Sequence, residues 1–355
     1  MRFDLDEQQR EFQQAATDFL QAECPVTRAL APHDTGSTDL GIWKGLMSIG
    51  IGGIMVPEEH GGLGLGLLDL AVVTEAVGRY AAPGPFIEHA LVTLAIALGG
   101  SEAQKARWLP LLAEGELLGT VAFAEGKGQW LPDHWSLPVK TRITGTKQHV
   151  LHAESADLIV VGLAGGRLAI VERGAQGISL TPVPCTDAGK QMSNIDFNDV
   201  PSELLPGDAA TRVIDAALVL LAADAFGGAS HCVQMAVDYA KLREQFGRPI
   251  GAFQAMKHQL ADMALAVEPN IGLYWYAAHV FDTDPPAASE AAALAKAHLC
   301  EVYPQVARRM IEAHGGIGYT WEFGAHVWLK RALFDQAYFG MPQAHRARVA
   351  TISGW

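Results

Sequence analysis

The chain has 355 residues, of which 49% are hydrophobic and 18% are charged, and its formal net charge is −13. This composition supports a large buried core and excludes an intrinsically disordered chain. The length suggests two or three packed subdomains. The acidic balance argues against nucleic acid or an anionic membrane as the main partner, because both bind basic surfaces.

The four cysteines are scattered along the chain, with neither a CxxC motif nor a Cys/His spacing. This distribution favours free thiols in a reducing compartment and predicts no metal site. No apolar signal segment follows Met1, and the apolar run 213–226 contains two aspartates and is too short to span a bilayer. We therefore expect a cytoplasmic protein without a membrane span.

Residues 1–117 are predicted to form a helical N-terminal domain. Apolar residues recur at helical spacing over 3–12, and Asp4 or Asp6 can cap the start of this helix. The glycine-rich stretch 50–68 predicts an irregular loop, because glycine is the residue that allows unusual backbone angles. Further helices are expected at 70–80 and 102–118.

Residues 118–206 are predicted to form a small central β domain. Short β-prone runs are separated here by Gly, Asp, Asn or Pro, a spacing typical of a small antiparallel barrel or sandwich. The expected strands are 120–124, 139–143, 149–151, 158–163, 167–172, 178–182 and 195–197.

Residues 207–355 are predicted to form a C-terminal helical bundle. Its first helix is expected to be long, from 209 to 243, since apolar residues repeat along it at helical spacing. Further helices are expected at 253–266, 269–280, 287–313 and 327–337. The fold class is therefore mostly α with a small central β domain.

Two motifs in this last block suggest a phosphate-containing ligand. After the long helix, Arg243 offers a bidentate fork suited to a diphosphate, Phe246 a flat face, and Gln254 an amide able to read an adenine edge. An ordinary helix–turn–helix corner would explain the same residues equally well. The second motif, 314–322, has three glycines in four positions and exposes backbone N–H groups, whereas a simple helix stop needs one glycine.

Both motifs resemble the acyl-CoA dehydrogenase superfamily. Three earlier segments share this resemblance: 56–64 (Val-Pro-Glu-Glu-His-Gly-Gly-Leu-Gly), 122–126 and 143–147. The resemblance covers about residues 5–350. It implies an acyl-CoA dehydrogenase-like fold, with an N-terminal helical domain, a β barrel or sandwich and a C-terminal four-helix bundle. It also implies FAD as cofactor, oxidation of the Cα–Cβ bond of an acyl-CoA thioester, and an electron-transfer flavoprotein as electron acceptor.

In this family FAD lies across a subunit interface, so the resemblance implies an oligomer. The neighbouring chain covers the ADP end, and the residues implied for that contact are Arg243, Phe246, Gln254, Gly315, Gly316 and Gly318. Glu312 departs from the pattern, because a carboxylate near a diphosphate would be repelled. On the flavin side, Ala124, His149 and Leu151 stand where relatives have Thr, an aromatic residue and Thr.

The catalytic base is the largest departure from the family pattern. The usual position is occupied by Phe339, and the alternative position on the long helix by Ala217; neither residue accepts a proton. Asp224 is the remaining acidic candidate for the base. It lies about two turns, roughly 10 Å, from Ala217 on the same helix face, and a structural Asp is the favoured interpretation.

This combination resembles the shorter, base-lacking subunits of α2β2 dehydrogenases that act on bulky CoA thioesters in lipid or steroid catabolism. We therefore expect a partner subunit, or a divergent homo-oligomeric member, of a flavin-dependent acyl-CoA dehydrogenase. Two alternatives stay open. The first is an autonomous dehydrogenase that uses Asp224 or a water-relayed base. The second is a flavin-free acyl-CoA-binding scaffold with the same fold.

Overall fold

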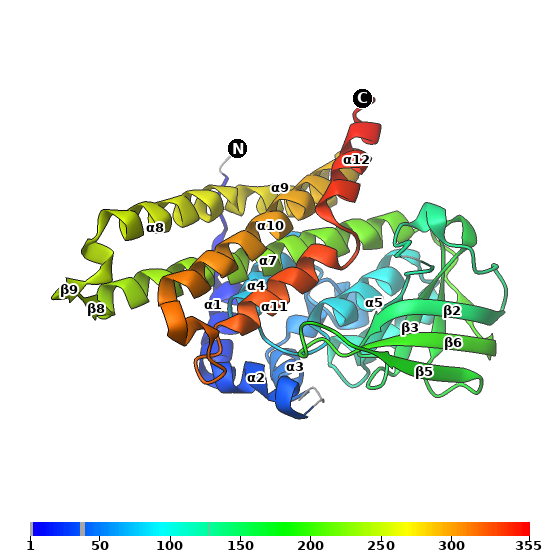
Figure 1. Ribbon diagram of the computed structural model, residues 1–355. Helices are drawn as coiled ribbons and strands as arrows, with labels where there is room; N and C mark the ends of the chain where they lie inside the picture. The colour runs from blue at the N-terminus through cyan, green and yellow to red at the C-terminus, as the bar shows by residue number, and fades with distance from the viewer. Residues whose placement is uncertain (1–2, 36–39, 127) are drawn as a thin grey trace.

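The computed structural model describes residues 3–35, 40–126 and 128–355. Helices form both ends of the sequence, and the strands of the central block lie at one end of the molecule (Figure 1). Among its described residues, the first block contains six α-helices: α1 (Glu7–Glu23), α2 (Val26–Thr35), α3 (Gly41–Ser48), α4 (Leu67–Arg79), α5 (Phe86–Gly99) and α6 (Glu102–Ala113).

The first helix begins with a reciprocal cap. The Asp6 carboxylate accepts a hydrogen bond from the Gln9 backbone N–H at 2.9 Å, and the Gln9 side chain accepts one from the Asp6 N–H at 3.1 Å. This capping box satisfies two of the N–H groups left free at a helix start. Of the two expected caps, Asp6 is therefore the one that forms.

The described part of the central block, which leaves out residue 127, holds seven strands in two sheets: β1 (Gly119–Ala122), β2 (Arg142–Leu151), β3 (Leu158–Leu163), β4 (Arg167–Glu172), β5 (Ile178–Val183), β6 (Met192–Pro201) and β7 (Glu203–Leu204). One sheet has the order β1-β3-β4-β7 and the other β2-β6-β5. Strands β1 and β3 pair in parallel, with Gly119 opposite Leu158. The two open sheets match the expected sandwich rather than a closed barrel, and the parallel pair was not expected.

The C-terminal block holds α7 (Ala210–Leu242), α8 (Gln254–Val267), α9 (Ile271–Thr283), α10 (Pro285–His314), α11 (His326–Ala337) and α12 (Pro342–Ile352). Helices α7 to α10 pack on one another as the expected four-helix bundle, and α11 and α12 pack against α10. Between α7 and α8 a two-stranded hairpin, β8 (Glu244–Gln245) with β9 (Arg248–Pro249), projects at the end opposite the sheets (Figure 1).

Helix α7 is the core of the molecule, packed between α4 on one side and α10 on the other. It is long and apolar enough to cross a membrane by composition, yet 94% of its most apolar window is buried within the protein. The helix approaches α4 closely because glycines lie at the crossing. A Cβ on Gly78 would lie 2.0 Å from the Asp224 carbonyl oxygen, and one on Gly227 would lie 1.9 Å from the Glu75 carbonyl oxygen.

Candidate functional site

The hairpin after α7 is built on a two-residue turn at its tip. Phe246 and Gly247 both have positive φ, 55° and 75°, the geometry that a tight hairpin of this hand requires. The Ile250 N–H donates to the Arg243 carbonyl at 2.8 Å and closes the base of the hairpin. Phe246 is not a glycine, so its left-handed backbone costs about 1–2 kcal/mol. Its side chain is 92% exposed, so burial of the Phe246 ring in the core does not offset that cost.

The polar residues expected to hold ADP lie on this exposed corner. Arg243 follows the last residue of α7, Gln254 begins α8, and both are exposed. Within the described part of the chain, neither side chain makes a hydrogen bond or an ion pair. An exposed Arg fork and amide with no internal partner have their hydrogen-bonding capacity available for a ligand or another subunit.

The glycine motif forms a short 3-10 turn, η7 (Gly315–Tyr319), at the end of α10. Gly315 has φ 61° and ψ −142°, a conformation that glycine alone adopts readily. At Gly318 a Cβ would lie 2.5 Å from the Ile311 carbonyl oxygen. Gly316 has neither restriction, since a Cβ there would meet open space. The fold therefore explains two of the three glycines, and Gly316 leaves bare backbone at the surface.

The bundle brings the two ADP motifs to the same end of the molecule (Figure 1). The rings of Tyr239, one turn before Arg243, and His314, just before Gly315, have centroids 4.4 Å apart. The His314 Nδ1 also pairs with the Met310 carbonyl at 2.7 Å. The exposed Glu312 is on the same turn of α10.

On the flavin side, β2 has a register shift between Lys147 and Val150. His149 lies in this irregular stretch with φ 55°, and its N–H donates to the Asn194 side chain at 3.2 Å. Leu151 is fully buried, and its carbonyl accepts the Thr120 hydroxyl at 2.6 Å. Ala124 pairs with β2 through the Gln148 N–H at 2.9 Å. The structure thus brings Ala124 beside the strand that carries His149 and Leu151.

Phe339 follows α11 with φ 58° and is 1% exposed. Its carbonyl is paired with His345 Nε2 at 3.1 Å. Burial lowers the pKa of His345 to about 4, so this imidazole is neutral near neutral pH. The ring of Phe339 contacts Phe123, Tyr338 and Trp130, with centroid distances of 6.2, 4.8 and 5.1 Å. The residue at the expected base position therefore lies in an aromatic cluster.

Trp130 is a residue of this region that the sequence did not single out. Its indole lies 5.1 Å from the Phe339 ring, 4.9 Å from Tyr338 and 5.9 Å from His149, centroid to centroid. It therefore joins the base position to the flavin-side strand. No spacing or motif around Trp130 indicates this, because its partners lie far away in the sequence.

The loop that carries Trp130 is anchored by a buried ion pair. Lys147 Nζ donates to Glu125 Oε1 at 2.5 Å, and the Ser136 N–H donates to the other carboxylate oxygen at 2.8 Å. Burial lowers the pKa of Lys147 to about 8, although Glu125 opposes the shift. Burial tends to raise the pKa of Glu125, but hydrogen bonds from Lys147 and Ser136 outweigh it and leave that pKa lowered.

Asp224, the candidate base, is buried in an ion pair. Arg331 Nη1 lies 3.2 and 3.4 Å from its two carboxylate oxygens, and Arg331 also donates to Asp187 and, at 2.9 Å, to the Ala82 carbonyl. Burial, together with the nearby Asp224 carboxylate, raises the pKa of Asp335 well above its ordinary value. Asp224 thus serves as a counter-ion for Arg331, the arrangement expected of a structural Asp. Its role as a base stays a prediction.

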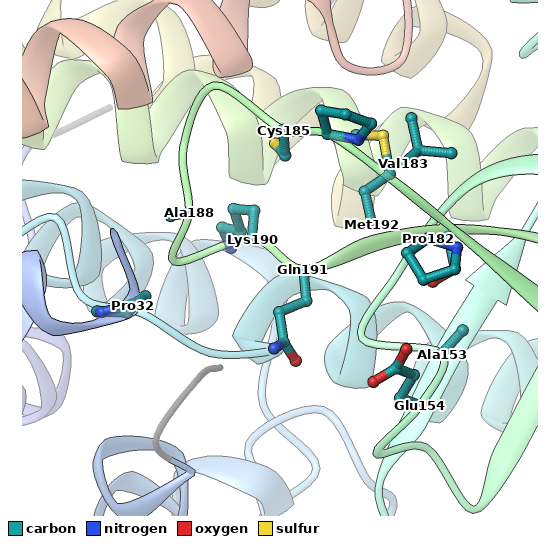
Figure 2. A pocket seen from close by; sticks show the side chains of 12 residues that line it. Pro32, Ala153, Glu154, Pro182, Val183, Cys185, Ala188, Lys190, Gln191 and Met192 are labelled. Atoms are coloured by element: carbon teal, nitrogen blue, oxygen red, sulfur yellow. The ribbon is translucent and has the colours of Figure 1, made fainter. Parts of the chain in front are cut away.

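A surface pocket of about 360 Å³ lies beside this cluster, between α2 and the segment joining β5 to β6 (Figure 2). Lys190 and Cys185 contribute to its wall. The Lys190 ammonium donates to the Gly84 carbonyl at 3.3 Å and lies 3.9 Å from Glu88, so internal groups already satisfy it. The pocket shares no residue with either the ADP corner or the aromatic cluster.

The chain matches family models and solved structures along most of its length. The acyl-CoA dehydrogenase N-terminal domain matches residues 6–116, and the C-terminal domain matches residues 208–353. Acyl-CoA dehydrogenase IpdE2 of Mycobacterium tuberculosis is 31% identical over 308 residues, covering 86% of this chain and 84% of that protein. A Tcur3481–Tcur3483 steroid ACAD variant superposes with TM-score 0.91 at 31% identity, covering 98% of each chain. The ChsE4–ChsE5 complex from Mycobacterium tuberculosis gives TM-score 0.92 at 25% identity, covering 100% of this chain and 99% of that one.

Proposed function

Because the chain belongs to the acyl-CoA dehydrogenase family of FAD-dependent oxidoreductases, we propose that it is the partner subunit of a heteromeric enzyme. In this assignment it contributes the ADP-binding corner to a flavin held mainly by a catalytic subunit. The substrate is a bulky acyl-CoA, such as a steroid-derived thioester. The name of one relative, a steroid ACAD, supports this substrate class, and the ChsE4–ChsE5 complex supports the heteromeric assembly.

One contrast carries the proposal. At the ADP corner, Arg243 and Gln254 are exposed and have no partner within the described residues, and Gly316 leaves bare backbone at the surface. At the base position, Phe339 is buried in an aromatic cluster and offers no group that takes up a proton. The chain is therefore equipped to bind part of the cofactor and lacks a positioned base of its own.

Each residue at the ADP corner has a definite task. FAD, when bound, would supply the hydride-accepting ring, and the electron acceptor would be an electron-transfer flavoprotein. Arg243 would pair with the diphosphate through its planar fork, Gln254 with the adenine edge, and Phe246 would offer its exposed ring as a stacking face. The bare backbone at Gly316 would allow the nucleotide to approach α10 closely.

An autonomous dehydrogenase that uses Asp224 has less support. A general base must be free to reach the substrate carbon, whereas Asp224 is 1% exposed and paired with Arg331. Without a positioned base, we expect the purified chain to oxidise acyl-CoA about 10²–10⁴-fold more slowly than an intact enzyme. Robust turnover of a simple acyl-CoA by the chain alone would overturn the proposal.

The direct test is purification of the tagged chain from its own host cells. We expect a second acyl-CoA dehydrogenase subunit to copurify, with FAD bound to the complex. Arg243→Ala in this complex should weaken FAD retention about tenfold to a hundredfold, because it removes a charge-assisted bidentate contact of about 1.5–3 kcal/mol. Gly316→Ala should also weaken FAD retention while leaving stability unchanged.

The control is Lys241→Ala, which removes an exposed positive charge two residues before Arg243. Lys241 forms a surface ion pair with Asp238, 3.9 Å away, so this variant should retain FAD as the wild type does. If Arg243→Ala and Lys241→Ala retain FAD equally at low flavin concentration, Arg243 has no specific role. A colourless protein without flavin, alone and in complex, would favour the scaffold alternative.

A further inference from the structure

The aromatic cluster brings Trp130 into contact with two positions that a working flavin site keeps apart. On one side is Phe339, at the base position, with ring centroids 5.1 Å apart and planes inclined by 31°. On the other is His149, on the flavin-side strand, at 5.9 Å and 32°. Aromatic rings at 4.5–7 Å are in direct contact. The indole therefore spans the space from one side to the other.

We propose that Trp130 fills the flavin space of this chain, so that this space excludes the isoalloxazine ring. This inference rests on the proposed function, in which the chain binds the ADP end of FAD held by another subunit. Such a chain binds ADP at the corner that carries Arg243 and Gln254, and it rejects the ring at the separate space beside Trp130.

The thickness of the required layers supports the exclusion. In an active subunit the flavin ring and the thioester must both lie between the base and the ring-contacting strand. Stacked atoms stay about 3.5–4.0 Å apart. The strand, the flavin ring, the thioester and the base therefore make three successive contacts, which together need roughly 10 Å or more. One indole in ordinary contact with both sides leaves no room for two further layers.

The position of Trp130 is fixed by its own loop. Its carbonyl accepts the Trp135 indole N–H at 3.1 Å, and Trp135 is buried and stacked on Phe123. Glu125 and Gln129 exchange two backbone hydrogen bonds, at 2.9 and 3.2 Å. Displacing Trp130 thus requires breaking contacts on both sides of it.

Two of the residues that contact Trp130 also carry backbone strain. Phe339 and His149 have φ values of 58° and 55°, a region that costs non-glycine residues about 1–2 kcal/mol. Such conformations persist where the surrounding structure holds them in place. Contact with the indole on both sides is one such restraint.

The experiment separates the two halves of FAD. Lumiflavin, which is the ring without ribityl phosphate or ADP, and ADP alone are titrated into the purified wild type and into Trp130→Ala. We expect Trp130→Ala to bind lumiflavin at least tenfold more tightly than the wild type and to bind ADP with unchanged affinity. The matched control is Trp275→Ala, which removes a partly buried indole on α9 that packs on Phe3, and it should behave as the wild type.

Comparable lumiflavin affinity in the wild type and Trp130→Ala overturns the inference. If Trp130→Ala does not fold, Phe339→Ala opens the same space from the opposite side and is judged by the same tenfold criterion. Arg243→Ala separates the two proposals. If it leaves ADP affinity unchanged while Trp130→Ala admits lumiflavin, the ADP role fails and the closure by Trp130 stands. The opposite result has two parts: Arg243→Ala abolishes ADP binding, and the wild type binds lumiflavin as tightly as Trp130→Ala does. In that case the ADP role of Arg243 stands and the closure by Trp130 fails.

Discussion

At the scale of single residues, chemical type alone did not identify function. Asp224 is the acidic residue on the face of α7 that a catalytic base would use, and the fold pairs it with Arg331. Phe339 was identified from its sequence position as an inert replacement, and the structure adds the aromatic cluster around it. Trp130 could not be found from sequence, because its role comes from contacts with distant segments.

The first prediction concerns Asp224. Asp224→Asn removes the carboxylate that faces a fully buried guanidinium, and breaking such a pair from one side costs about 3 kcal/mol. Urea denaturation should show this loss in the free energy of unfolding. The control Asp238→Asn, an exposed position on the same helix, should lose less than about 1 kcal/mol. If Asp224 were a catalytic base without a structural role, Asp224→Asn would keep the free energy of unfolding of the wild type and would lose an existing dehydrogenase activity.

At the scale of elements, the long segments with clear helical periodicity were predictable, whereas some shorter helices were not. Residues 209–243 were expected as one long helix and form α7 over Ala210–Leu242. Helix α5, Phe86–Gly99, was missed, because it is apolar almost throughout and shows no polar face. The runs expected at 139–143 and 149–151 form one strand, β2, since an irregular stretch near His149 interrupts its alternation.

The crossing of α4 and α7 gives a second prediction. Gly227→Ala places a Cβ 1.9 Å from the Glu75 carbonyl oxygen, so the two helices must separate. Overpacking of this kind lowers stability by about 1–3 kcal/mol, which thermal or urea unfolding will measure. Gly174→Ala is the matched control, because a Cβ there meets nothing within 4 Å. An equal effect of the two changes would show that close packing at the crossing is unimportant.

A third prediction concerns pH and the contact between α5, α6 and β1. His89 is buried, with Nε2 at 3.0 Å from the Leu112 carbonyl and Nδ1 accepting the Gly119 N–H at 3.3 Å. Burial lowers the pKa of His89 to about 4. Between about pH 6.5 and 4 the unfolded chain therefore binds a proton that the folded chain does not.

Stability contributed by neutral His89 is thus present above its unfolded pKa and is lost as the pH falls through this window. The expected slope is about 1.4 kcal/mol per pH unit. His89→Gln keeps both hydrogen bonds and removes the titration, so its unfolding free energy should fall less steeply with acid. The exposed His258→Gln should follow the wild type. Identical slopes for the wild type and His89→Gln would contradict the prediction.

At the scale of the whole molecule, the order of helices, strands and helices could be read from the change of periodicity along the chain.

The inferred FAD site needs two chains, so a fourth prediction is an oligomer. Sedimentation should give at least twice the chain mass of 38.0 kDa. Leu242 and Leu265, on α7 and α8, are 81% and 70% exposed, which suggests that a neighbouring subunit covers them.

Leu265→Glu should therefore weaken assembly about tenfold or more, since burying a leucine contributes about 1.5–3 kcal/mol. Lys257→Glu, on the same helix, changes charge without removing apolar surface and is the control. A flavin-loaded monomer of 38.0 kDa would show that no second chain is needed.

Arg331 connects parts of the chain that the sequence separates into blocks. Its guanidinium binds the Ala82 carbonyl in the N-terminal block, Asp187 beside the β sheets, and Asp224 in the central helix. Detaching any one block would leave buried ionic or polar groups without their partner, at a cost of several kcal/mol. The three blocks are therefore cooperative in folding, so that heating or denaturant should unfold them in one transition. Limited proteolysis should not release the strands as a stable fragment.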